Sequence, residues 1–131
     1  MNEVLQFLTD NHVFYLATMD GDTPKVRPLG FVMEYDGKLC FSTNNKKNMY
    51  KQLISNPKFE ICVASESGEW LRLSGKATFC TNKQVKQAAL DTAPFLKNMY
   101  SVEDSIFEIF YADEAEAVFS NMKGASRTVK L

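Results

Sequence analysis

Residues 12–43, HVFYLATMDGDTPKVRPLGFVMEYDGKLCFST, decide the fold of this chain. Two runs rich in β-forming residues, 12–19 and 25–33, flank an Asp-Gly-Asp turn signal at 20–22, a pattern that is typical of a β-hairpin. A further turn leads into a third apolar run, 39–43, which ends in a polar loop. The stretch therefore predicts three consecutive short strands.

Outward from this stretch, the pattern predicts further elements on both sides. We expect helices at 3–9, 46–55 and 82–91, the last resuming towards Tyr100 after Pro94, and strands at 58–64, 70–80, 106–111 and 116–120. Gly75 predicts a bulge inside its strand, and residues 112–114 predict a turn. About seven short strands, with a helix between the third and fourth, favour a small barrel over βαβ layers.

Composition limits the chemistry of the side chains. The chain has 131 residues, 45% hydrophobic, which fits one domain over residues 1–131, and its 16 aromatic side chains supply apolar area for a core and a subunit interface. Fifteen basic and 16 acidic residues leave a net charge of -1, which disfavours binding to nucleic acid. One histidine and three scattered cysteines predict no metal site and no thiol-disulfide motif. Demanding chemistry would therefore come from a bound cofactor.

The N-terminal stretch and the cysteines bear on location. The start, MNEVLQFLTDNH, has no basic targeting region and no apolar run of membrane-spanning length, so we expect a cytoplasmic protein that does not enter a membrane. The odd cysteine count agrees with a reducing compartment. Each cysteine lies in an apolar or β-rich stretch, so we interpret all three as small buried hydrophobic residues without chemistry.

Residues 42–51, STNNKKNMYK, combine three lysines with no acidic residue where a strand passes into a helix. A helix start already carries partial positive charge and unpaired N–H groups, so stability alone would favour an acidic residue there. The hydroxyls, amides and ammonium groups of this stretch would suit a phosphate. The candidate phosphate-binding residues are Ser42, Thr43, Lys46, Lys47 and Asn48. The alternative is a solvated lysine face with Asn44 or Asn45 as N-cap.

The second predicted strand has an interruption at Arg27-Pro28-Leu29-Gly30. Pro28 cannot donate to a sheet ladder and Gly30 has no side chain, so this segment could present bare backbone to a flat ligand. The Arg27 guanidinium could bind a phosphate through two hydrogen bonds at once. The alternatives are an ordinary edge strand and an exposed arginine.

Other polar and aromatic residues give weaker signals. Trp70 and Arg72 share one face of a strand and suit stacking or an interface, although a Trp that covers the barrel explains the pattern equally well. His12 follows the first predicted helix, and a cation is stabilised by the negative C-terminal end of a helix dipole. Capping or surface exposure therefore explains His12 better than catalysis. The paired carboxylates fall in turn-like positions and are interpreted as surface groups. We assign no catalytic side chain.

Three stretches in order carry a family resemblance: ATMDGDTPKVRPLGFV, GKLCFSTNNKKNMYKQLISNPKFEICV and WLRLSGKATF. The ordered set resembles the pyridoxamine 5'-phosphate oxidase-like family of flavin-binding split barrels, especially its short bacterial nitroimidazole-resistance-like members. The resemblance covers about residues 13 to 80, and the C-terminal third agrees in strand pattern. It implies a mainly β fold with α-helices, a six-stranded split barrel with short flanking helices, and a homodimer with FMN in clefts between the subunits.

The resemblance also implies roles for particular residues. Arg27 matches an arginine that reaches the FMN phosphate, and Pro28, Leu29 and Gly30 match backbone that borders the ring system. Ser42, Thr43, Lys46, Lys47 and Asn48 fall where relatives place phosphate-binding residues. Trp70 falls where the second subunit touches the flavin, with Arg72 nearby.

Departures from the family narrow the expected activity. Authentic pyridoxine phosphate oxidases look like they end in a segment with an arginine and a histidine that bind the substrate. In this chain Arg127 is followed by Thr-Val-Lys-Leu, without a histidine, which argues against vitamin B6 oxidation. His12 lies in no haem-ligand motif, and a deazaflavin remains an alternative to FMN. The resemblance implies an FMN oxidoreductase that passes hydride or electrons between a reduced nicotinamide, NAD(P)H, and a small organic acceptor.

Two other functions remain open at this stage. One is a non-enzymatic flavin or small-ligand binding protein, such as a stress-related carrier or sensor. The other is a cofactor-free dimer used for protein interaction, which would leave Lys46 and Lys47 unexplained.

Overall fold

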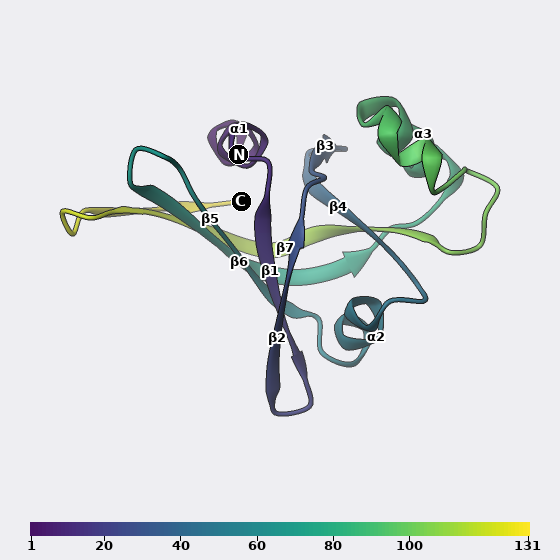
Figure 1. The fold of residues 1–131 in the computed structure, drawn as a ribbon, viewed down its shortest axis with the longest axis horizontal. Helices are drawn as coiled ribbons and strands as arrows, with labels where there is room; N and C mark the ends of the chain where they lie inside the picture. Colours follow the sequence, from purple (N-terminus) through teal and green to yellow (C-terminus); the bar gives the residue numbers. More distant parts are fainter.

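A computed structural model describes residues 1–131, and it contains three α-helices, one short 3-10 helix and eight β-strands (Figure 1). In chain order these are α1 (Asn2–Asp10), β1 (Phe14–Asp20), β2 (Thr23–Leu29), β3 (Met33–Tyr35), β4 (Lys38–Asn44), α2 (Asn48–Ser55), β5 (Lys58–Ala64), β6 (Glu69–Phe79), α3 (Lys83–Thr92), η1 (Pro94–Asn98), β7 (Phe107–Asn121) and β8 (Ser126–Lys130). None of the helices has the length and apolar character needed to cross a membrane.

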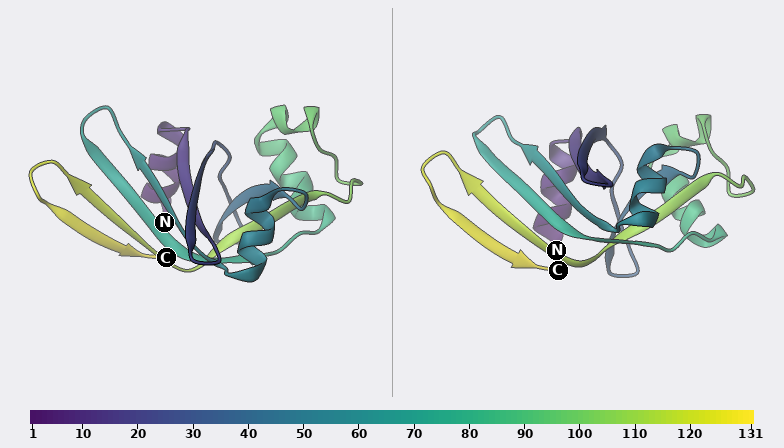
Figure 2. Two further views of the ribbon diagram at one scale, coloured as in Figure 1. Left: turned by 60° about the horizontal axis from the view of Figure 1, so that its bottom comes forward. Right: turned by 90° about the horizontal axis from the view of Figure 1, so that it is seen from below.

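The strands form one antiparallel sheet in the order β2-β1-β5-β6-β7-β4-β3, with β8 paired to β7. The long strand β7 organises this sheet, because β6 lies along one edge of it while β4 and then β8 occupy the other. Figure 2 shows that the sheet is strongly curved, with α3 near one end of β7 and the β7–β8 turn at the other. This architecture is consistent with a split barrel.

The strand count differs from the predicted six-stranded barrel and from the seven strands expected from the pattern. The first reason is the 25–33 run, which was expected as one strand but is divided: β2 ends at Leu29, and residues 33–35 form β3, which pairs with β4 instead of β1. The division falls at Gly30, where a Cβ would lie 3.3 Å from the backbone oxygen of His12. A residue without a side chain lets the chain leave the β1–β2 ladder at this close approach.

The second reason lies in the C-terminal third. The turn predicted at 112–114 is wrong, because β7 runs without a break from Phe107 to Asn121. The predicted bulge at Gly75 is confirmed: the register of β6 against β7 shifts between Ser74 and Lys76. Opposite this point Glu114 has a positive φ of 49°, so a bulge bends the paired strands where the polar residues suggested a turn. The tail, for which no element was predicted, supplies β8.

Two hydrophobic clusters pack on the sheet, and β7 contributes to both. The larger has 18 buried residues and includes Phe41, Phe59 and Phe110 together with apolar residues of α1 and α2. The smaller has 10 buried residues and includes Phe107, together with apolar residues of α3 and η1. Because side chains alternate along a strand, Phe107 and Phe110 point to opposite faces of β7 and enter different clusters. We call these the large cluster and the small cluster.

Candidate functional site

A cleft of about 210 Å³ lies where the β2–β3 connection, the end of β4 and η1 meet. It brings together six of the ten residues singled out from the sequence, although they come from two separate stretches of the chain. The lining residues are Pro28, Leu29, Gly30, Phe31, Ser42, Thr43, Lys47, Phe95, Leu96, Met99 and Tyr100. On one side the cleft is bordered by the end of β2, where Pro28 still lies opposite Tyr15, and by Gly30 just after the strand. On another side it is bordered by the strand-to-helix turn before α2.

The hydroxyl of Thr43 is the most informative polar group of the cleft. Thr43 is only 3% exposed, and its Oγ1 is buried without any hydrogen-bond partner in the protein. An unpaired buried hydroxyl costs about 1–3 kcal/mol, so native proteins rarely leave one unless a ligand or water completes it. Thr43, one of the residues that line the cleft, therefore has an unused hydrogen-bonding group.

The start of α2 provides positive charge without a neutralising partner. Lys47 is the N-cap residue, its side chain accepts no capping hydrogen bond, and the first turn contains no acidic residue. Lys46, Lys47 and Asn48 are exposed, and neither lysine takes part in an ion pair. Free N–H groups, the positive end of the helix dipole and two unpaired ammonium groups together make this turn attractive to an anion.

Two asparagines hold the turn before α2 in place. Asn44 donates from Nδ2 to the Tyr100 hydroxyl at 2.8 Å, while its Oδ1 accepts from the backbone N–H of Lys46 at 3.1 Å. Asn45 donates from Nδ2 to the Glu108 carboxylate at 2.8 Å and to the Ser105 carbonyl at 2.7 Å. The Asn side chains therefore anchor the turn to distant segments, and neither Asn44 nor Asn45 is the N-cap of α2, which is Lys47.

Arg27 lies beside the cleft but does not line it. Its guanidinium donates to Thr18 Oγ1 at 2.7 Å, to Gln52 Oε1 at 2.8 Å and to the Leu16 carbonyl at 3.3 Å. Partial burial lowers the pKa of Arg27 from its ordinary value. Three of the five N–H donors of an arginine are therefore used within the protein, and Arg27 ties β2 to α2.

Trp70 also lies away from the cleft within this chain. It is half-buried at the start of β6, opposite Ala64 on β5 and Ser120 on β7. Its neighbour on the same strand face, Arg72, forms a 2.9 Å ion pair with Glu60. One protomer by itself therefore does not bring Trp70 to the residues of the cleft.

The lining residues from η1, and the two residues that follow it, were not singled out from the sequence. Phe95 and Met99 are 57% and 59% exposed, and they line the cleft together with the buried Leu96 and with Tyr100. Tyr100 stacks on Phe107 with ring centroids 4.5 Å apart. The apolar pattern of this segment was visible, but only the fold places it across from residues 28–31 and 42–47.

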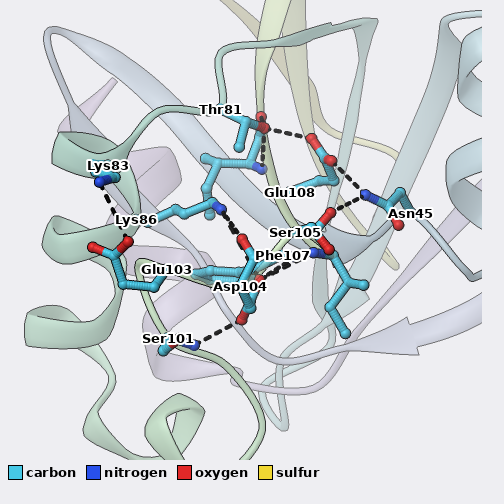
Figure 3. Close-up of polar contacts among 12 residues, drawn as sticks. Asn45, Thr81, Lys83, Lys86, Ser101, Glu103, Asp104, Ser105, Phe107 and Glu108 are labelled. Atoms are coloured by element: carbon cyan, nitrogen blue, oxygen red, sulfur yellow. Dashed lines mark hydrogen bonds and ion pairs between the residues drawn. The ribbon is translucent and has the colours of Figure 1, made fainter.

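A polar network fastens the segment after η1 to the rest of the molecule (Figure 3). The carboxylate of Asp104 accepts hydrogen bonds from the backbone N–H groups of Ser101, Ile106 and Phe107 at 2.7–3.1 Å. The buried Lys86 of α3 donates to the Asp104 carbonyl at 2.8 Å. Burial acts to raise the pKa of Asp104, but the backbone hydrogen bonds and the Lys86 charge outweigh it and leave this pKa below its ordinary value. The segment that carries Tyr100 is thus held in a defined position.

Comparison with known proteins identifies relatives of this fold. The family described as pyridoxamine 5'-phosphate oxidase matches residues 1–123. No curated protein sequence matches the chain. A solved NimC/NimA family protein from Clostridium acetobutylicum is 46% identical, with a TM-score of 0.96 over 100% of this chain and 92% of that one.

More distant solved structures share the fold at low sequence identity. A pyridoxamine 5'-phosphate oxidase-related, FMN-binding protein from Nostoc punctiforme is 15% identical, with a TM-score of 0.64 over 99% of this chain and 95% of that one. An FAD-binding protein from Mesorhizobium loti is 16% identical, with a TM-score of 0.62 over 92% of this chain and 94% of that one. The family match and the C. acetobutylicum structure together establish that this chain belongs to the pyridoxamine 5'-phosphate oxidase family.

Proposed function

We propose that this protein binds a flavin, FMN, in the cleft between residues 28–31, 42–47 and η1, and uses it as an oxidoreductase. The observation that carries the proposal is the unpartnered hydroxyl of Thr43, a residue that lines a cleft beside an unneutralised helix N-terminus. Family membership and the flavins named for the N. punctiforme and M. loti proteins support it. The donor set suits a phosphate-bearing, flat ligand.

The chain's own residues would divide the binding between two ends of the cofactor. The phosphate dianion would meet Ser42, Thr43, Lys46, Lys47 and Asn48 at the start of α2. The ring system would lie along the Pro28–Gly30 segment, where the proline and glycine leave the backbone accessible. When bound, FMN supplies hydride chemistry, and we propose NAD(P)H as donor and a small organic molecule as acceptor.

The hydrogen bonds that Arg27 already makes limit how it would bind the phosphate. Two of its N–H donors have no partner within the protein, so it can reach an anion without giving up Thr18 or Gln52. Its three internal hydrogen bonds would hold the guanidinium plane, which reduces the entropy lost when the ligand binds.

A homodimer would complete the site. Val13, just before β1, is exposed, as are Tyr15 on β1 and Val26 on β2. The cleft exposes Phe95 and Met99, so a single protomer leaves several apolar side chains uncovered. A partner subunit that covers these residues could bring its own Trp70 to the flavin. A monomeric mass at micromolar concentration with FMN still bound would contradict this arrangement.

One observation favours a second function, a non-enzymatic flavin carrier or sensor. The residues that line the cleft include no histidine, cysteine or carboxylate, so the protein offers few groups for acid-base chemistry there. An oxidoreductase of this kind would rely on solvent to protonate its reduced product.

The visible spectrum of the purified protein tests whether the protein binds a flavin. We expect a yellow protein, or a colourless one that takes up added FMN, and a protein that does neither would refute flavin binding. The same spectrum separates FMN from a deazaflavin. Anaerobic mixing with NADH or NADPH then separates the enzyme from the carrier, since only the enzyme's flavin should bleach rapidly.

The lysines give the sharpest test of the phosphate position. Lys46→Ala combined with Lys47→Ala should weaken FMN binding by about 1–3 kcal/mol, because charged hydrogen bonds to the phosphate are lost. The matched control is Lys123→Ala with Lys130→Ala, which removes the same charge from exposed positions at the β7–β8 hairpin. Equal FMN affinity in the two double variants would place the phosphate elsewhere.

A further inference from the structure

A second cavity, of about 150 Å³, lies at the β3–β4 turn, away from the residues of the flavin cleft. Its lining residues are Tyr35, Asp36, Lys38, Cys40, Cys80, Asn82 and Tyr111. Two of the three cysteines of the chain therefore meet here, although 40 positions separate them in the sequence. A cavity of this size accepts a molecule comparable to benzene.

The two cysteines flank β7 from opposite sides. Cys40 on β4 lies opposite Tyr111, whereas the backbone N–H of Cys80 donates to the Ile109 carbonyl across the other edge of the strand. The strand β7 thus lies between the two backbone segments, and both cysteines are free thiols. The pair is held as two thiols, with Cys40 only 1% exposed and Cys80 partly exposed.

The hydrogen bonds of the pair leave Cys80 able to ionise. Cys40 Sγ lies 3.8 Å from the Lys38 carbonyl, and Cys80 Sγ lies 3.7 Å from the Ile109 carbonyl. The Ile109 carbonyl also accepts from the Cys80 backbone N–H at 2.9 Å, so it keeps a partner when the Cys80 thiol loses its proton.

The charges around the cavity favour a thiolate at Cys80. The Lys38 ammonium lies 4.9 Å from the centre of the Tyr111 ring, and Asn82, the N-cap residue of α3, places the positive end of that helix beside the cavity. Asp36 is the one carboxylate among the lining residues. Glu108, the nearby carboxylate on β7, is occupied by Thr81 and Asn45.

These contacts separate the two thiols chemically. Hydrogen bonding from Cys40 lowers the pKa of Cys80, burial opposes this change, and the Lys38 charge adds to the lowering. The same pairing, together with burial, raises the pKa of Cys40, which keeps Cys40 protonated as the donor. Thiols with a lowered pKa, partial exposure and a cationic neighbour are the reactive ones in proteins.

We propose that this cavity is a modification site in which Cys80 is the nucleophile for small α,β-unsaturated carbonyl compounds, with Cys40 and Lys38 as its positioning residues. The Cys80 proton leaves to solvent, and the thiolate sulfur attacks the β-carbon. An S–C bond forms while the C=C π bond breaks, its electron pair moves onto the carbonyl oxygen as an enolate, and water protonates the α-carbon. No oxidant is needed, and the product is a thioether at Cys80.

The test labels the full-length protein with N-ethylmaleimide in a Cys62→Ser background and follows intact mass and peptide maps from about pH 6 to about pH 9, with glutathione as a reference thiol whose pKa is about 8.5–9. We expect one adduct, at Cys80, and a rate relative to glutathione that rises as the pH falls. Below both pKa values, each unit by which the Cys80 pKa is lower should contribute up to about tenfold in thiolate fraction.

Variants of the neighbouring residues test whether Cys80 reacts because of its surroundings or only because it is accessible. Lys38→Gln and Cys40→Ala should each slow labelling of Cys80 several-fold and move its pH dependence to higher pH, whereas Lys58→Gln, an exposed lysine on β5, should leave both unchanged. Lys38 is exposed, so its variant keeps the test informative if Cys40→Ala does not fold. An unlabelled Cys80, a rate and pH dependence equal to those of glutathione, or insensitivity to Lys38→Gln would overturn the proposal.

Discussion

The large and small clusters, packed on the two faces of β7, differ in what surrounds them. The large cluster is bounded by α1 and α2 and contains a continuous set of aromatic contacts, in which Phe110 lies 5.6 Å from Phe41 and 6.0 Å from Phe59 between ring centroids. The small cluster is bounded by α3 and η1. Its members Phe31 and Leu96 line the cleft proposed to bind a flavin, and its member Cys40 lines the second cavity. The cleft and the second cavity therefore both border the small cluster.

The largest expected effect comes from a matched pair of variants on β7, Phe110→Ala and Phe107→Ala. Both side chains are 0% exposed, so each truncation should lower the free energy of unfolding by about 3–5 kcal/mol. Only Phe107 stacks on Tyr100, so only Phe107→Ala should also weaken FMN binding to the folded protein. Chemical denaturation and flavin titration below the unfolding transition would measure the two effects.

This pair tests whether the clusters are separable. If Phe110→Ala weakened FMN binding as much as Phe107→Ala at equal fractions of folded protein, the two faces of β7 would act as one core. Retention of affinity in the Phe110 variant alone would support the division.

An intermediate effect is expected from the polar network under the small cluster. Because the pKa of Asp104 is lowered in the folded protein, its contribution to stability is complete above the unfolded pKa, near 3.8, and is lost as the pH falls through the lower, folded value. Asp104→Asn should cost about 1–3 kcal/mol near neutral pH, because the backbone N–H groups of residues 101, 106 and 107 lose a charged acceptor. The difference in unfolding free energy between the wild type and this variant should shrink in acid.

The control for Asp104 is Asp91→Asn, which changes an exposed carboxylate on α3 that accepts a hydrogen bond from Gln87 at 2.8 Å. Its stability should stay within about 0.5 kcal/mol of the wild type. A difference between Asp104→Asn and the wild type that stays constant down to about pH 3 would show that the carboxylate charge does not stabilise this segment.

The smallest expected effect contrasts two buried threonines. Thr43→Val removes a hydroxyl without a partner, so stability should hold or rise while FMN binding weakens by about 0.5–1.5 kcal/mol, the value of one hydrogen bond. Thr18→Val removes a hydroxyl that donates to Gln52 at 2.6 Å and accepts from Arg27 at 2.7 Å, so unfolding should become easier by about 1–3 kcal/mol. Unfolding curves and flavin titrations distinguish the two. Unchanged FMN affinity in Thr43→Val would remove the observation on which the proposed cleft depends.

Local patterns predicted most elements of the first 80 residues. The 12–19 run, the helix after Asn44-Asn45 and the bulge at Gly75 all appear in the structure, because turn residues and apolar periodicity act within a few positions of one another. The prediction was wrong where a distant partner decided the outcome. Residues 33–35 pair with β4 instead of continuing β2, and β8 exists because β7 offers it an edge.

Composition and local pattern by themselves determined that this is a mainly β chain, short of acid-base groups, with a cationic helix start and an interrupted strand. Those properties depend on neighbours in the sequence, so they can be read without the fold. The tertiary structure alone decided that residues 28–31, 42–47 and 95–100 share one cleft, that Arg27 is tied to Thr18 and Gln52, and that Cys40 and Cys80 meet across β7. The physical reason is that sheet pairing brings together groups tens of residues apart, and their burial and partners, which set their chemistry, exist only once the strands have paired.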